Sequence, residues 1–105
     1  MGILVHELAH ARSGDKGNTS NIAVIAYDEA AWPLLRRELT EERVHRAFVH
    51  LGASAVKRYE VESLRALNFV ITDVLAGGVT RSLRLDPHGK SLSALILGIE
   101  LPHHP

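Results

Sequence analysis

The chain has 105 residues, of which 46% are hydrophobic and 23% charged, a balance typical of one globular domain spanning residues 1–105. Lysine plus arginine and aspartate plus glutamate number 12 each, so the formal net charge is zero, which argues against nucleic-acid and membrane-surface binding. The absence of cysteine excludes disulfides, thiolate nucleophiles and cysteine-bound metals, and no apolar run is long enough to span a membrane, so we expect a cytoplasmic protein.

The first quarter of the chain predicts two strands joined by a glycine-rich turn. Residues 3–10 alternate loosely and end at a turn signal, which is typical of a short strand. Residues 13–19 combine glycines with aspartate, lysine and asparagine and predict a loop. Residues 21–27, NIAVIAY, are rich in β-branched side chains and predict a buried strand.

Two helices are predicted to follow. Asp28 is a suitable N-cap for the first, which runs to Leu39 with Pro33 near its start, where proline is tolerated. Thr40 is a suitable N-cap for the second, and Gly52 ends it. The second helix has one apolar face, formed by Val44, Ala47, Phe48 and Leu51.

The second half of the chain predicts further strands and helices. We expect a strand over 56–61, a helix over 64–75, a strand over 79–85 and a turn over 86–89. The 64–75 helix is predicted from one stripe and a glycine C-cap, namely Leu64, Leu67, Asn68, Ile71 and Leu75 followed by Gly77–Gly78. Residues 91–99 fit either a short helix or the return strand of a hairpin, and we favour the helix. The irregular alternation predicts an α+β two-layer sandwich.

Residues 6–10, HELAH, match the zinc-protease pattern His-Glu-x-x-His. That motif works on a helix, which places both imidazoles on one face. On a strand, the Cα atoms of His6 and His10 would be about 13 Å apart, too far to close easily on one zinc ion. We therefore reject a metalloprotease, and we expect neither a metal nor a cofactor.

Residues 12–18, RSGDKGN, form the better candidate for a functional segment. Glycines let backbone N–H groups approach a ligand, Arg12 and Lys16 can hold an anion, and Asp15 could act as a base. The spacing matches neither a Walker A loop nor a dinucleotide fingerprint, and Asp15 and Asn18 can equally build an ordinary turn. Two similar segments, 77–82 and 86–90, could converge with it at one end of the sheet. The candidate ligand-binding residues are Arg12, Ser13, Asp15, Lys16, Asn18, Asn68, Arg81 and Lys90.

Separated stretches of the sequence resemble one known family. The stretches are LAHARSGDKGNTSNIAVIA and RYEVESLRALNFVITDVLAGGVTRSLRLDPHGKSLS, and their most specific parts are 12–18 with Asn21, 67–69, Gly77–Gly78, and Asp86 with Gly89–Lys90. They resemble the C-terminal ferredoxin-like domain of AtuA-like (acyclic terpene utilisation) proteins, which also occurs as a separate small protein. The resemblance implies a ferredoxin-like α+β sandwich, an AtuA-type large partner, and a context in the breakdown of terpenoid or branched acyl-CoA compounds. It supplies no catalytic residues.

Two hypotheses of function follow, and whether the chain is an enzyme stays open. The first is a non-catalytic small subunit or interaction domain that assembles with an AtuA-type large protein and also forms a homo-oligomer. The second is a domain that binds an anionic small molecule, such as an acyl-CoA or a carboxylate, through the glycine-rich turns. We expect no nucleic-acid partner and no membrane association, since no basic or aromatic surface stands out.

Overall fold

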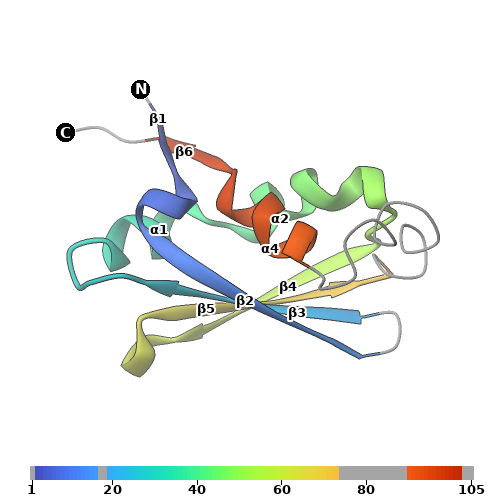
Figure 1. The fold of residues 1–105 in the computed structure, drawn as a ribbon, viewed down its shortest axis with the longest axis horizontal. Helices are drawn as coiled ribbons and strands as arrows, with labels where there is room; N and C mark the ends of the chain where they lie inside the picture. Colours follow the sequence, from blue (N-terminus) through green and yellow to red (C-terminus); the bar gives the residue numbers. More distant parts are fainter. Residues whose placement is uncertain (1, 17–18, 74–89, 103–105) are drawn as a thin grey trace.

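The computed structural model describes residues 2–16, 19–73 and 90–102. Figure 1 shows two layers, with a sheet on one side and the helices packed together over one of its faces. The sheet has four antiparallel strands in the order β2-β3-β5-β4. Their bounds are β2 Ala9–Lys16, β3 Thr19–Ala26, β4 Ala55–Val61 and β5 Ala66–Thr72.

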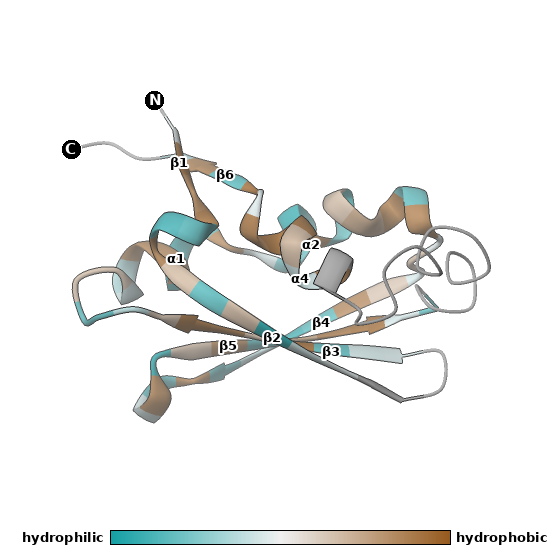
Figure 2. Ribbon diagram, viewed as in Figure 1, coloured by the Kyte–Doolittle hydropathy of each residue, from teal (hydrophilic) through white to brown (hydrophobic). Residues whose placement is uncertain are grey.

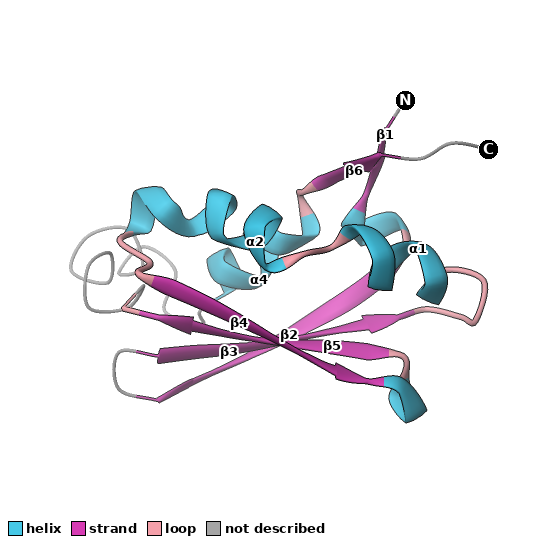
Figure 3. Cartoon of the chain, turned by 180° about the vertical axis from the view of Figure 1, so that it is seen from behind, coloured by secondary structure: helices cyan, strands magenta, loops and turns pink. Residues whose placement is uncertain are grey.

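The second layer consists of helices and a small additional sheet. The helices are α1 Trp32–Glu38, α2 Glu41–Phe48 and α4 Lys90–Leu97, and the short 3-10 helices are η1 Val5–Glu7, η2 Val49–Leu51 and η3 Glu62–Leu64. Strands β1 (Gly2–Leu4) and β6 (Glu100–Pro102) pair with each other in a separate two-stranded sheet. In the opposite view of Figure 3, α1, α2 and α4 again lie on one side of the four-stranded sheet. The arrangement is an α+β sandwich of the predicted class.

The hydrophobic core lies between the two layers because the central strands alternate with period two. In β3, the buried side chains are Ser20, Ile22, Val24 and Ala26, and the residues between them are only partly buried. In β5, Leu67, Phe69 and Ile71 are fully buried on the same face. The helices contribute Leu35, Leu39, Val44, Phe48, Leu92 and Ile96. Figure 2 shows the corresponding hydrophobic colouring along the strands and helices that face each other.

The helix predicted over 64–75 is wrong, because this part of the chain forms strand β5. The residues at 64, 67, 68 and 71 do fall on one helical stripe, but Leu67, Phe69 and Ile71 also fit a period of two. β5 pairs with β3 on one side and with β4 on the other. This pairing and the one-sided burial outweigh the weak local preference for a helix.

The single strand predicted over 3–10 is also wrong. β1 ends at Leu4, a 3-10 turn follows, and β2 starts at Ala9. The Leu8 N–H donates to the Val5 carbonyl at 2.8 Å, and the Leu4 N–H donates to Glu7 Oε2 at 2.9 Å. These bonds close the turn, Val5 is fully buried beneath it, and the chain passes from the small sheet to the large one.

The loop predicted over 13–19 is shorter than expected. β2 continues to Lys16 and β3 starts at Thr19, with Ser13 opposite Ile22 and Gly14 opposite Asn21. Residues 13–16 therefore belong to a strand, because pairing with β3 provides hydrogen bonds that a loop would lack. The predicted strand over 21–27 is confirmed in β3.

Of the remaining element predictions, the N-cap of the first helix is wrong, the others within the described residues are confirmed, and the rest fall on residues that the structure does not describe. Thr40 caps α2, since its Oγ1 accepts the Arg43 N–H at 3.2 Å, and Gly52 ends the following turn with a φ of 94°. The prediction that Asp28 caps the first helix is wrong, because α1 starts at Trp32 with Ala31 at its N-cap position. Asp28 instead accepts the Ala31 N–H at 2.9 Å, in the turn that precedes α1. The strand over 56–61 and the helix over 91–99 are confirmed in β4 and α4. The predictions for 77–89 lie outside the described residues.

Candidate functional site

Two predicted ligand-binding residues, Arg12 and Asn68, lie in one row across the four-stranded sheet. Arg12 is opposite Ala23, and Ala23 is opposite Asn68. Asn68 in turn is opposite Tyr59 on β4. Adjacent strands are about 4.7–4.9 Å apart, so the row extends on the order of 14 Å from Arg12 to Tyr59. The sheet thus brings together two residues that lie far apart in the sequence.

The same strand geometry separates Arg12 from Ser13. Successive residues of a strand point to opposite faces, so exposed Arg12 points away from the helices and partly buried Ser13 points toward them. Asp15 and Lys16 belong to the end of β2, opposite Ser20 and Thr19, and Lys90 begins α4, which packs on β2. Asn18 and Arg81, with the predicted turns at 77–82 and 86–89, lie outside the described residues.

We call the face of the four-stranded sheet that points away from the helices the open face. It consists of the even-numbered residues of β2 and β5 and the odd-numbered residues of β3 and β4, continued by Tyr27. Figure 1 shows α1, α2 and α4 on the other side of the sheet. None of the residues of this face within the described strands is an aspartate or a glutamate.

Both tyrosines of the chain lie on the open face and are exposed. Tyr27 is 59% exposed and Tyr59 is 53% exposed, whereas the tryptophan and both phenylalanines are buried in the core. The Tyr27 ring stacks on His10, with the two ring centroids 5.7 Å apart. Tyrosine side chains are enriched at protein interfaces compared with the rest of the protein surface. The distribution of aromatic side chains therefore identifies the open face as a candidate protein interface.

Arg12 differs from the other arginines of the described part of the chain. The other six each pair with a carboxylate, namely Arg36, Arg37, Arg43, Arg46, Arg58 and Arg65. Within residues 2–16, 19–73 and 90–102, no ion pair includes Arg12 or Lys57, a second exposed cation of the open face. Both side chains are exposed, so the face presents two cations that have no carboxylate partner in the described part of the chain.

The family of the chain follows from a comparison with family models. The model of the AtuA ferredoxin-like domain matches residues 3–102. The chain belongs to the AtuA ferredoxin-like domain family. No curated protein and no solved structure matches it significantly.

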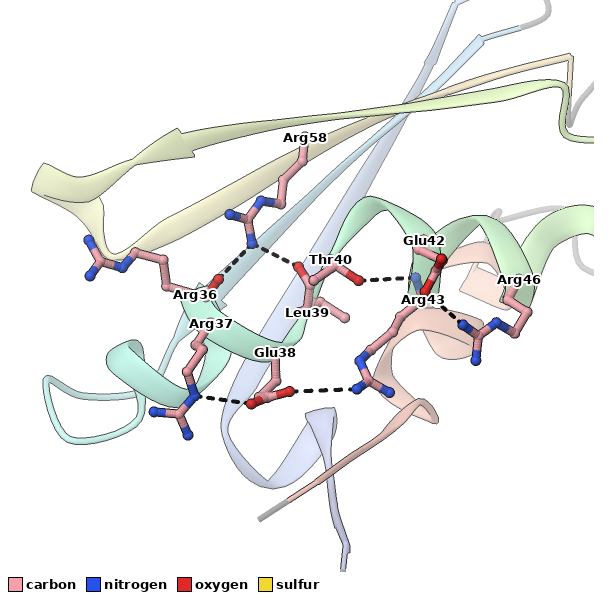
Figure 4. A network of polar contacts seen from close by, with 9 residues as sticks. All are labelled: Arg36, Arg37, Glu38, Leu39, Thr40, Glu42, Arg43, Arg46 and Arg58. Atoms are coloured by element: carbon pink, nitrogen blue, oxygen red, sulfur yellow. Dashed lines mark hydrogen bonds and ion pairs between the residues drawn. The ribbon is translucent and has the colours of Figure 1, made fainter. Parts of the chain in front are cut away.

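Arg58 shows what a structural arginine does in this AtuA ferredoxin-like domain. Its Nη1 donates to the carbonyl oxygens of Arg36 and Leu39 at 2.7 and 2.9 Å, and its Nη2 lies 3.0 Å from Glu60 Oε2. Its backbone N–H donates to Glu41 Oε2 at 2.8 Å. Figure 4 shows the guanidinium reaching from β4 to the link between α1 and α2. These bonds hold the helices on the sheet.

A cleft of about 690 Å³ lies beside this arginine, between α2 and the outer edge of β4. It is lined by Thr40, Glu41, Glu42, Arg58, Tyr59 and Glu60. Three of these side chains are carboxylates, and the one guanidinium already binds two carbonyls and Glu60. Negative charge of this kind repels a carboxylate or a phosphate. The cleft is therefore a poor site for an acyl-CoA.

The residues of the HELAH segment lie on different elements of the AtuA ferredoxin-like domain. His6 is in η1, and His10 is in β2, stacked on Tyr27. Among the residues that the structure describes, no three histidine, aspartate or glutamate side chains are placed to hold a metal ion. No helix of that same part is long and apolar enough to cross a bilayer.

Tyr27 and Lys57 also belong to the open face, and neither was predicted as a functional residue from the sequence. The signal was present for β4, because Lys57 and Tyr59 alternate with Val56 and Arg58. This alternation does not identify which of the two faces of the sheet the helices leave uncovered. That depends on where the helices pack, which only the complete fold determines.

Proposed function

We propose that this domain is a non-catalytic small subunit that binds an AtuA-type large protein through the open face, in the breakdown of terpenoid or branched acyl-CoA compounds. One observation carries the proposal: α1, α2 and α4 cover one face of the sheet, and the other face exposes both tyrosines and Arg12, which has no ion pair among the described residues. Tyrosine and arginine are the residue types most enriched among the energetically dominant positions of interfaces.

The composition of the open face supports a protein partner. Ala23, Ile25 and Val70 provide partly buried apolar surface at its centre, and the exposed tyrosines lie at the end of β3 and on β4. A tyrosine buries roughly 150–250 Å² when a partner covers it and orders only two side-chain torsions. An apolar centre with tyrosines and cations around it is typical of an interface.

Arg12, which forms no ion pair with the residues that the structure describes, also supports the second candidate, an anionic small molecule such as a carboxylate. Asn68 lies two strands away in the same row and could add an amide donor. The clefts at the β4–α2 edge and beside β1 and β6 are not lined by Arg12 or Asn68, so they do not support this candidate. A thermal-shift screen with CoA esters tests it, and a response that Arg12→Ala leaves unchanged would remove the proposed site.

The proposed association is tested by co-expression with the AtuA-type large protein of the same organism, followed by calorimetry on the purified proteins. We expect a complex, and we expect Tyr59→Ala to weaken it about 30-fold. Val49→Ala is the matched control, because Val49 is equally exposed at 53% but lies in η2, beyond α2. Two folded proteins that never associate would refute the proposal.

A further inference from the structure

The charges of this domain are distributed unequally between its two sides. The carboxylates that form ion pairs lie on the helices, on the turns beside them and on the helix side of β4, such as Glu38, Glu42 and Glu60. The open face carries Arg12 and Lys57 and, within the described strands, no carboxylate. A chain with a net charge of zero therefore presents a cationic surface on one side.

The spacing of the two cations favours an extended partner over a small anion. Arg12 lies on one edge strand and Lys57 on the other, three strand spacings apart and two residues apart along the strands. Strand dimensions place their backbones on the order of 16 Å apart. A single carboxylate or phosphate cannot bridge that distance, whereas carboxylates spaced over a protein surface can meet both groups.

A second copy of this domain is a poor occupant of the same face. Two identical open faces would bring Arg12 and Lys57 of one copy near those of the other, and the face offers no carboxylate to offset the repulsion. The homo-oligomer expected from the sequence would therefore use another surface. A partner with negative charge has the complementary pattern.

We infer that the surface that docks on the open face is an acidic protein surface, with carboxylates opposite Arg12 and Lys57 and an apolar patch opposite Tyr59, which lies two residues from Lys57 on β4. This inference rests on the proposed function, since it names the chemistry of the partner at the same interface. Because the two cations are exposed, their contacts lie toward the rim, where charge governs salt dependence and the rate of association.

The experiment measures the affinity for the AtuA-type large protein at 50 and 300 mM NaCl, with charge reversals on both sides of the domain. We expect wild-type binding to weaken about 10-fold at the higher salt, and Arg12→Glu and Lys57→Glu each to weaken it about 10-fold at the lower salt. Arg46→Glu is the matched control, because it makes the same change of charge at an exposed position of α2. We expect it to change the affinity less than twofold. Circular dichroism checks that each variant is folded.

Each outcome has a distinct meaning. A complex that tolerates both reversals and high salt, but is lost in Tyr59→Ala, would overturn the acidic partner and leave the proposed function intact. The absence of any complex at either salt concentration would refute the proposed function, and the inference with it. A dimer of this domain in sedimentation equilibrium that Tyr59→Ala dissociates would place a second copy on the open face and also overturn the inference.

Discussion

Replacing Arg58 by methionine tests the view that one guanidinium holds the helical layer on the sheet. The substitution keeps most of the buried stem and removes the bonds to the carbonyls of Arg36 and Leu39 and the ion pair with Glu60. The Arg58 side chain is 20% exposed; its bond to the Leu39 carbonyl is partly buried, whereas its bonds to the Arg36 carbonyl and to Glu60 are exposed. The Arg58 backbone N–H keeps its bond to Glu41, because a substitution does not remove it.

The expected loss of stability in Arg58→Met follows from the contributions of the individual bonds. The bond to the part-buried Leu39 carbonyl contributes roughly 1.5–3 kcal/mol, as is typical for a bond to a charged group. The Arg36 carbonyl is more exposed and can be hydrated, and the half-exposed Glu60 adds about 0–1 kcal/mol. We expect Arg58→Met to lower the free energy of unfolding by about 2–3 kcal/mol. For a domain of this length, that corresponds to a fall in Tm of roughly 10–20 °C.

Urea unfolding followed by circular dichroism measures the change. Lys57→Met is the matched control, because Lys57 is the preceding cation on the same strand. The Lys57 side chain belongs to the open face and has no ion pair among the described residues. We expect this substitution to change the free energy of unfolding by less than about 0.5 kcal/mol. Glu60→Gln isolates the ion pair. Equal stabilities of Arg58→Met and Lys57→Met would refute the reasoning, and a full loss in Glu60→Gln would assign the effect to the ion pair instead of the carbonyls.

Two further substitutions test the reading of the fold. Thr40→Ala should lower the free energy of unfolding by about 1 kcal/mol in urea unfolding, because it removes the side-chain cap of α2. Thr40→Ser keeps the hydroxyl and should retain most of this stability. Equal losses for the two substitutions would argue against the cap. Phe69→Ala should cost about 3–5 kcal/mol, because Phe69 is fully buried at the centre of β5. Val70→Ala, one position along on the open face, should cost clearly less, and the opposite order would contradict the assigned faces.

The sequence predicted best where local pattern and tertiary environment agree. In residues 21–27, β-branched side chains recur at the spacing that the buried face of β3 requires, and Thr40 begins a helix by a bond to its own first turn. The helix prediction for residues 64–75 was wrong because local pattern and tertiary environment disagree there. Their apolar positions satisfy both a helical stripe and a strand, and only pairing with β3 and β4 selects the strand.

The candidate site was predictable in part for a similar reason. Arg12 and Asn68 were selected as polar residues in distinctive settings, and the strand register does bring them onto one face. Ser13 was grouped with Arg12 because glycine, aspartate and asparagine nearby predict a loop, in which neighbours can share a ligand. In a strand, neighbours point to opposite faces, so the group divides. No local pattern predicts that the helices leave the Arg12 face uncovered.

The pairing of β1 with β6 has a consequence for how this domain can be joined to other chains. Gly2 lies opposite Pro102, so the first and last described strands meet side by side, on the helix side of the molecule and away from the open face (Figure 1). A short linker between these positions should give a circular permutant that folds, since the closure adds little constraint. The domain can likewise be inserted into a loop of a host protein, because the two connections to the host lie close together. The open face then still points away from the host.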